Sequence, residues 1–485
     1  MATNYGIKDI QTLEGIEAIR LRPGMYIGSV GPEGVRHITL EIISNAVDEY
    51  LNGACSHVTV SYNTKENLIY VADNGRGVPF GKAEDGSETL VNIYTKLHTG
   101  AKFDSEGKTG YNTSGGMNGV GAKATNALSA SFLVESERDG KIASAYFERG
   151  KLIEYKEVKV IGGAINGTRV EFVPDPEIFK EGATLDVNLL RKQLQELAFL
   201  SPGLTFTLRI DNSSEEITSK NGLLDYLDYL AKEKDNLTSK FYAETNEGRI
   251  GVKVALMYID QFTDTYKLYT NSIPNTGGTH LTGFRTALTQ AINAYAREKG
   301  LLKEKEENLT GDDLKEGLVL TLSLTMPDPV FSGQTKEVLS SAEGRTVVQR
   351  LCSTALATWL RNNERDAKTI INKALLARKA RENARKAKEN VRNAAAKTSR
   401  AVLPGKLADC SSKKREDCEI FIVEGDSAAG TAKEARDRGT QAILPVRGKI
   451  LNVLKADLHK AMQNEEIKSM ITAFGLEIKD NKIIL

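Results

Sequence analysis

The stretch HITLEIISNAVDEYLNG, residues 37–53, gives the strongest structural signal in the first part of the sequence. Leu40, Ile43 and Val47 are apolar and recur at helical spacing, and Gly53 follows the pattern. This spacing predicts an amphipathic helix of about four turns.

A polar stripe runs along the same predicted helix. Glu41, Asn45 and Asp48 stand at positions i, i+4 and i+7, which share one helix face. An ordinary solvated face has this composition, and a functional site is the alternative. Residues 37–53 alone leave both interpretations open.

Two strand signals follow the helix. VTVSY (58–62) alternates between apolar and polar residues, and LIYVA (68–72) is a short apolar run that ends at DNGRG (73–77). The two segments predict a hairpin with turn chemistry at each end, which places Asp73 at the end of a strand. Because Asp-Asn-Gly is common turn chemistry, a plain turn is the alternative to a binding residue here.

Residues 96–121 form a long polar segment that is rich in glycine. Gly107-Lys108-Thr109 looks like the end of a P-loop, but Lys102 stands where that motif requires a glycine. The dinucleotide fingerprint also fails, because no strand precedes Gly119-x-Gly121. Glycines followed by a predicted helix over 122–128 favour a phosphate site, with a mobile surface loop as the alternative.

The rest of the chain divides into further α+β regions. The polar segment DNSSEEITSKNG (211–222) marks the first boundary, and the second region closes with a helix expected from about Val347 to Arg400. Residues 364–400 hold 12 Lys/Arg and 4 Asp/Glu, although the whole chain has a net charge of only +1. This basic helix is either a solvated interdomain helix or a DNA contact. A new α/β pattern begins at EIFIVEGDSAAG (419–430).

Length and composition indicate a globular protein of about three domains, because 485 residues with 40% apolar and 27% charged residues can form several cores. No apolar run approaches the roughly 18–20 residues of a membrane span, and the N-terminus lacks the pattern of a signal peptide. We therefore expect a cytoplasmic protein with no membrane partner. The four cysteines are too few for a disulfide framework, so we expect free, buried thiols.

The helix, the strand ending in Asp-x-Gly-x-Gly and the glycine loop occur in the order of one known ATP-binding fold. They resemble the fold shared by gyrase, the heat-shock chaperone, histidine kinases and mismatch-repair proteins. Further motifs look, more narrowly, like the ATPase component of the bacterial type IIA DNA topoisomerases, the family of the B subunits of DNA gyrase and topoisomerase IV. These motifs are IRLRPGMYIG (19–28), QTK (334–336), LPGKLADC (403–410), IVEGDSAAG (422–430) and ILPVRGKILNV (443–453).

The resemblance implies an α+β fold in three parts. Residues 1–217 would form a GHKL (Bergerat-type) ATPase α/β sandwich. Residues 218–400 would form a ribosomal-S5-like α+β transducer domain with a long basic C-terminal helix. Residues 401–485 would form an incomplete α/β TOPRIM domain.

The resemblance also implies which residues bind and hydrolyse ATP. Glu41 is the expected general base, Asn45 the expected Mg²⁺ ligand, and Asp73 the expected reader of adenine. Lys336 of the second domain is expected to reach the γ-phosphate as a second catalytic residue. The other expected ATP-binding residues are Tyr5, which would cross to the partner protomer, Asp48, Arg76, Gly77, Pro79, Lys102, Gly115, Gly116, Asn118, Gly119, Val120, Gly121, Thr168 and Gln334.

The implied function is ATP-driven strand passage by a type II DNA topoisomerase. ATP would make the chain a homodimer that captures a DNA segment, and the breakage-reunion A subunit would be the second protein partner. Glu424 is the expected ligand of a second Mg²⁺, and Lys449 is expected near the cleaved DNA. Because no Asp-x-Asp pair follows, half of this metal site is missing, and we expect a chain truncated within the TOPRIM domain that does not cleave DNA even when mixed with the A subunit.

Two alternatives belong to other classes of function. One is an ATP-driven clamp of the chaperone or mismatch-repair kind, which binds DNA or protein without cutting. The other is a truncated regulatory module that binds DNA or the breakage-reunion protein. LPGKLADC and EGDSA argue against the clamp, and ATP turnover at high protein concentration would argue against the regulator.

Overall fold

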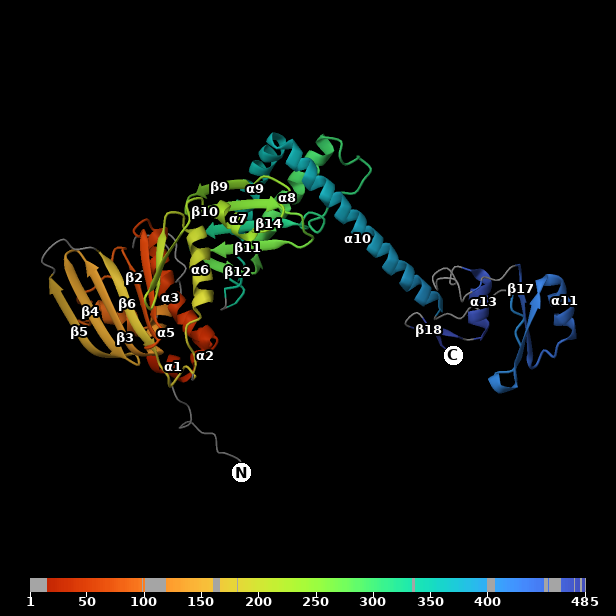
Figure 1. Cartoon of the computed structure of the whole chain (residues 1–485), viewed down its shortest axis with the longest axis horizontal. Helices are drawn as coiled ribbons and strands as arrows, with labels where there is room; N and C mark the ends of the chain where they lie inside the picture. The colour runs from red at the N-terminus through yellow and green to blue at the C-terminus, as the bar shows by residue number, and fades with distance from the viewer. Residues whose placement is uncertain are drawn as a thin grey trace, which may run out of the picture. The chain divides into compact units, whose positions relative to one another are not determined.

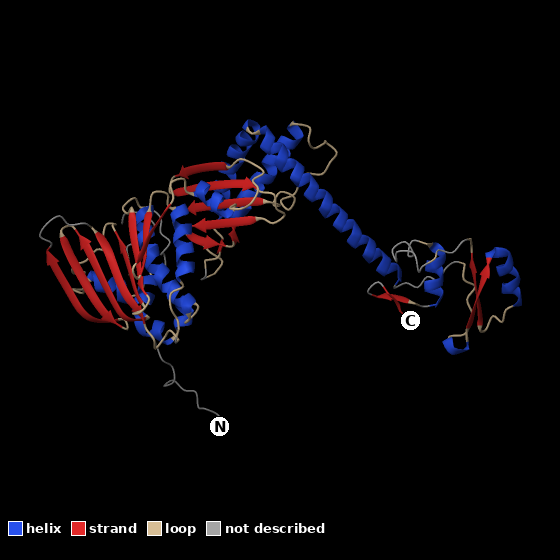
Figure 2. Ribbon diagram, in the orientation of Figure 1, coloured by secondary structure: helices blue, strands red, loops and turns tan. Residues whose placement is uncertain are grey.

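The computed structural model describes residues 15–97, 99–100, 119–159, 166–180, 182–333, 336–398, 406–448, 452, 464–474, 476–479 and 482–484. The chain forms two compact units, Met1–Arg378 and Lys379–Leu485. Figure 1 labels the elements and Figure 2 shows how helices and strands alternate along the chain.

The first unit contains an eight-stranded sheet among its described residues, in the order β5-β4-β3-β6-β2-β1-β7-β8. Most neighbours are antiparallel, whereas β1 and β7 are parallel. The strands are β1 (His57–Asn63), β2 (Leu68–Asp73), β3 (Ser129–Arg138), β4 (Lys141–Glu148), β5 (Lys151–Lys159), β6 (Gly167–Pro174), β7 (Thr205–Ile210) and β8 (Ser213–Thr218). The predicted hairpin is confirmed, because β1 and β2 pair directly.

Helix α3 carries the polar stripe and is longer than residues 37–53 alone suggest. It begins at Pro32, where a missing N–H costs nothing, and ends at Leu51, just before Gly53 takes the positive φ of 74°. The other helices packed with this sheet are α1 (Gly15–Leu21), α2 (Pro23–Ile27), α4 (Thr89–Thr95), α5 (Gly121–Ala127) and α6 (Val187–Leu200).

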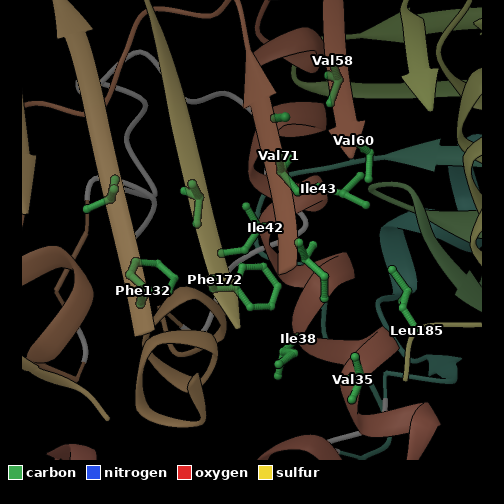
Figure 3. Packing of buried hydrophobic residues seen from close by; sticks show 14 of the residues in the cluster. Val35, Ile38, Ile42, Ile43, Val58, Val60, Val71, Phe132, Phe172 and Leu185 are labelled. Carbon is green, nitrogen blue, oxygen red and sulfur yellow. The ribbon is translucent and has the colours of Figure 1, made fainter. Parts of the chain in front are cut away.

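The first core lies between these helices and the sheet. Ile38, Ile42 and Ile43 of α3 belong to one buried cluster with Phe132 and Phe172 of the sheet, and Figure 3 shows Phe172 beside Ile42. The rings of Phe132 and Phe172 are stacked with centroids 6.3 Å apart. This packing fixes the orientation of α3 and leaves Glu41 and Asn45 of its polar stripe partly exposed.

A second, five-stranded sheet in the same unit has the order β12-β11-β14-β10-β9. Its strands are β9 (Phe241–Glu247), β10 (Ile250–Tyr258), β11 (Thr265–Thr270), β12 (Ile273–Asn275) and β14 (Leu318–Thr325). Every residue of β14 except its last is buried, which is the pattern of a central strand. The short strands β13 (Gly277–Gly278) and β15 (Val338–Leu339) pair in parallel beside it, and the helices are α7 (Leu223–Leu230), α8 (Thr279–Glu298) and α9 (Ala342–Asn362).

Two expectations about secondary structure were wrong. The helix expected from Val347 to Arg400 is two helices, α9 and α10 (Glu364–Thr398), because Asn363 leaves the helical conformation and its side chain binds the carbonyl of Trp359. No strand was expected in the polar segment 211–222, but its first part forms the edge strand β8. An edge strand tolerates polar residues because one of its sides faces solvent.

The second unit has a parallel pair of strands, β16 (Glu419–Glu424) and β17 (Gln441–Val446), in register from Glu419 opposite Gln441. Helix α11 (Gly425–Ala435) follows β16 directly and contacts β17. The other elements among its described residues are the 3-10 turn η3 (Arg415–Asp417), α13 (Glu465–Phe474), β18 (Glu477–Lys479) and β19 (Lys482–Ile484). In the described part of both units, none of the helices combines the length and apolar composition of a bilayer span.

Candidate functional site

The polar stripe of α3 is not an ordinary solvated face. Asp48 is 2% exposed and its neighbour Glu49 is 8% exposed, whereas Glu41 and Asn45 are partly exposed. Buried carboxylates are rare unless they are paired or functional. The stripe therefore has a buried end, at Asp48 and Glu49, and an open end at Glu41.

Glu49 holds Arg76 with three hydrogen bonds. The Arg76 Nε atom donates to Oε2 of Glu49 at 2.9 Å, Nη2 donates to Oε1 at 2.9 Å, and the backbone N–H of Arg76 donates to Oε2 at 3.1 Å. Two parallel guanidinium bonds are the strongest arrangement for this pair of side chains. They fix the turn after β2 against α3.

Asp73 ends β2 in a partly buried position. Its Oδ1 accepts a hydrogen bond from the N–H of Gly75 at 2.8 Å, and Thr168 of β6 stands directly opposite it in the sheet. Burial raises the pKa of Asp73 to about 6, and the negative charge of Glu49 acts in the same direction. The backbone N–H groups of Gly75 and Thr168 oppose this rise by binding the carboxylate. A carboxylate with such a pKa, at a strand end, is typical of a functional site.

The turn that follows Asp73 needs glycine at position 77. Gly77 has φ +76°, and a Cβ atom there would lie 2.5 Å from the carbonyl oxygen of Glu137. The Gly77 carbonyl accepts a hydrogen bond from Nη1 of Arg138 at 3.3 Å. Pro79, two residues further, is exposed at the rim of this turn.

The start of α5 lies against Glu41. Gly119 has φ +58°, Val120 is the residue before the helix, and a Cβ atom on Gly121 would overlap the carboxylate of Glu41. Thr125 of α5 donates to the carbonyl of Ile38 in α3 at 3.0 Å, which ties the two helices together. The backbone at Gly121 therefore approaches the open end of the polar stripe more closely than a residue with a side chain would allow.

Lys336 lies in the segment before β15, in the part of the unit that contains the second sheet. It has φ +57°, and its carbonyl accepts a hydrogen bond from Nδ2 of Asn275 at 2.9 Å. In the second unit, Glu424 ends β16 and is exposed where α11 begins. Predicted site residues that lie outside the described residues are Tyr5, Lys102, Gly115, Gly116, Asn118, Gln334 and Lys449.

Sequence reasoning missed two residues of this site, Glu49 and Arg138. Glu49 continues the series Glu41, Asn45 at intervals of four, so the stripe itself contained the signal. Arg138 gave no such signal, because it reaches Gly77 from a strand 61 positions later in the sequence.

The fold and this site define a class of protein: the ATPases that resemble histidine kinases, DNA gyrase B and HSP90. The family model with that description matches residues 31–176, the DNA gyrase B model matches 222–390, and the Toprim domain model matches 419–485.

The chain belongs to the DNA gyrase B family. It is 44% identical to the B subunit of DNA gyrase from Clostridium acetobutylicum over 97% of this chain and 74% of that relative. The 43K ATPase domain of Thermus thermophilus gyrase B, solved with an aminocoumarin, has a TM-score of 0.64 at 37% identity over 78% of this chain and 98% of that one. The topoisomerase IV ATP-binding domain of Francisella tularensis has a TM-score of 0.65 at 29% identity, over 76% and 98%.

Membership of this family establishes the general activity. The chain is an ATP-hydrolysing subunit of a type II DNA topoisomerase, with a GHKL ATPase region, a transducer region and a Toprim region. The gyrase B and Toprim matches favour this function over the non-cutting clamp that the sequence left as an alternative.

Proposed function

We propose that the site formed by α3, the end of β2 and the start of α5 binds ATP, with Glu41 as the general base. The observation that supports this role best is the approach of residue 121 to the Glu41 carboxylate. Backbone N–H groups beside a carboxylate can hold a phosphate while the carboxylate accepts a proton from the attacking water. His37 Nε2 lies 3.5 Å from Oε1 of Glu41 and would help to orient it.

Asp73 is proposed to read adenine. A carboxylate accepts a hydrogen bond from the exocyclic amine of adenine, whereas guanine presents a carbonyl at that position. Arg76 and Gly77 would shape the wall of the base pocket through the Glu49 and Arg138 contacts, and Thr168 would hold the Asp73 carboxylate. We therefore expect ATP to bind more tightly than GTP.

Mg²⁺ is the proposed metal cofactor, and the residues at the open end of the stripe fit it. Asn45 and Glu41 lie one helical turn apart and both are partly exposed, and hard cations prefer such oxygen donors together with water and phosphate oxygens. Asn45 would hold the ion, which would neutralise negative charge on the triphosphate. Asp48 is buried below them and would orient its neighbours rather than contact nucleotide.

The finer assignments extend this proposal to other parts of the chain. Lys336, with Gln334, would contact the γ-phosphate from the transducer region, and Lys102 with residues 115–121 would cover the phosphates. Tyr5 would cross to a second copy of the chain, so that ATP would promote a homodimer that captures DNA. Glu424 would belong to an incomplete Mg²⁺ site of the TOPRIM region and Lys449 would lie near DNA, with the A subunit as the second protein partner, in the cytoplasm.

The Glu41→Ala variant tests the general-base role. We expect kcat for ATP to fall at least about 100-fold, whereas the Kd of a non-hydrolysable ATP analogue should change less than about threefold. Glu33→Ala is the matched control, because Glu33 is an exposed glutamate in the first turn of the same helix. An equal loss of binding and turnover would remove Glu41 from this role. Absence of turnover in the unmodified chain, even at high concentration, would favour the regulatory alternative.

A further inference from the structure

Two partly exposed cysteines lie side by side in the second unit. The Sγ atoms of Cys410 and Cys418 are 3.5 Å apart, and neither residue takes part in a disulfide. The expectation of buried thiols is confirmed for Cys55 and Cys352, which lie in the first unit, and is wrong for Cys410 and Cys418. The ATPase chemistry uses none of the four.

The backbone holds the two sulfur atoms in this position. Hydrogen bonds at both ends of the segment 410–418 join it to residues 438–443, which lie just before β17 and in its first half. Arg436 also binds the carbonyl groups of Ala408 and Gln441 through Nη1. The backbone hydrogen bonds are Ala408 N to Ile443 O, Ile443 N to Ala408 O, Ser411 N to Arg438 O, Ser412 N to Gly439 O and Glu419 N to Thr440 O.

A disulfide requires an S–S distance of about 2.05 Å, so each sulfur needs to move by less than about 1 Å. Side-chain rotation and small shifts of the exposed segment can supply such a movement. Because both ends of the segment are already attached to residues 438–443, the bond would leave the pairing of β16 with β17 unchanged.

Metal binding is the other chemistry open to two neighbouring thiols. A structural zinc site needs four ligands, usually Cys and His. Within the described residues, no group of three or more His, Cys, Asp and Glu side chains could hold a metal ion. Thiol oxidation therefore fits this pair better than metal coordination.

We propose that Cys410 and Cys418 form a reversible disulfide by exchange with a low-molecular-weight disulfide. One cysteine thiolate attacks the small disulfide, forms a mixed disulfide and releases one small thiol. The second cysteine thiolate then attacks the protein sulfur of that mixed disulfide and releases the second small thiol. The two cysteines are oxidised together, the small disulfide is reduced to two thiols, and the two protons lost by the cysteines are taken up by the released thiolates.

The other two cysteines provide internal controls. Burial raises the pKa of Cys55 to about 11 and that of Cys352 to about 12, so neither forms much thiolate at neutral pH. Partial burial and the adjoining Cys418 also raise the pKa of Cys410. Because Cys410 is partly exposed and its Sγ lies 3.5 Å from that of Cys418, we still expect it to react before the buried Cys55 and Cys352.

The experiment incubates the full chain with oxidised glutathione and measures free thiols, intact mass and cross-linked peptides. We expect two of the four thiols to disappear without a glutathione adduct, a peptide pair joined through Cys410 and Cys418, and full recovery with dithiothreitol. Cys418→Ser should carry one glutathione on Cys410 and no cross-link, and Cys410→Ser should give the converse. Cys352→Ala should cross-link like the unmodified chain.

Three results would overturn the proposal: four thiols that all remain titratable, stable glutathione adducts on both cysteines, or a cross-link that involves Cys55 or Cys352. Far-UV circular dichroism and ATP turnover of each variant show that it is folded. If one serine variant fails to fold, the other supplies the same comparison.

Discussion

A Cβ atom placed on Gly121 would lie 2.6 Å from Cδ of Glu41 and 3.1 Å from its Cβ. The first of these distances is shorter than non-bonded carbon atoms tolerate, so an alanine at position 121 would force the Glu41 carboxylate to move. The start of α5 and the proposed general base therefore constrain each other directly.

Gly121→Ala should impair hydrolysis without impairing folding. Alanine is a better helix former than glycine, by about 0.5–1 kcal/mol, so the stability of the chain should not fall. A displaced carboxylate should lower kcat about 10- to 100-fold, because general-base catalysis depends on the position of the acceptor atom. Steady-state ATP turnover and thermal unfolding measure the two effects. Gly24→Ala, at a position with open space around the Cβ, should leave kcat unchanged. A normal kcat in Gly121→Ala would contradict this geometry.

Arg76→Lys should weaken nucleotide binding. A lysine ammonium cannot make the two parallel bonds from Arg76 to Glu49 and leaves Glu49, which is 8% exposed, with fewer donors. Loss of these hydrogen bonds should weaken the turn by about 1–3 kcal/mol. If binding loses the same free energy, the Kd of an ATP analogue, measured by calorimetry, should rise roughly 5- to 150-fold. Arg209→Lys, at an exposed position on β7, is the control. Equal Kd values for the two variants would argue against a role for the Glu49 contact.

Nucleotide binding should depend on pH through Asp73. Its pKa in the folded chain, about 6, lies above the ordinary value of 3.8, so the folded chain binds a proton here that the unfolded chain has released. The stabilisation from this proton is complete below pH 3.8 and is lost as the pH rises through about 6. Adenine binding needs the opposite state, because the unprotonated carboxylate is the better acceptor for the amine.

We therefore expect the affinity for an ATP analogue to increase as the pH rises through about 6, by up to about tenfold per unit below that value. Asp73→Asn keeps an oxygen acceptor but cannot titrate in this range, so it should bind more weakly and lose the dependence that belongs to Asp73. Titrations of both proteins across this range also correct for ionisation of the nucleotide. The same pH profile in both would assign the effect to another group.

The sequence predicted the parts of this structure that depend on local pattern. Residues 37–53 form a helix and Asp73 ends a strand, because periodicity and turn residues are local signals. The Glu49–Arg76 contact joins residues 27 positions apart, so no local pattern contains it. The end of α9 also escaped prediction, because it depends on Asn363 binding the Trp359 carbonyl and not on a proline or glycine. Strand β8 was not expected either, because its sequence is polar and it forms a strand only by pairing with β7.

Glu196 of α6 links the ATPase region to the second sheet. Its Oε1 accepts a hydrogen bond from Nζ of Lys267 at 2.7 Å, and its Oε2 accepts one from the hydroxyl of Tyr269 at 3.2 Å. The Tyr269 hydroxyl also lies 2.9 Å from that of Tyr226, and Tyr226 and Tyr269 belong to one buried cluster with Phe199 at the end of α6. The Glu196 side chain is only 17% exposed, so water replaces these contacts poorly.

Glu196→Ala should therefore destabilise the contact between α6 and the second sheet by about 1–3 kcal/mol, because it leaves polar groups on Lys267 and Tyr269 without their acceptor. Glu215→Ala is the matched control: Glu215 pairs with Arg191 of the same helix, but both side chains are more than 40% exposed, so we expect a loss of at most about 1 kcal/mol.

Urea unfolding followed by fluorescence of Trp359, the single tryptophan, reports on the region of the second sheet. Glu196→Gln, which keeps an acceptor without the charge, should lie between the unmodified chain and Glu196→Ala. Equal shifts in the urea midpoint for Glu196→Ala and Glu215→Ala would show that burial of the Glu196 contacts contributes nothing to the stability of this region.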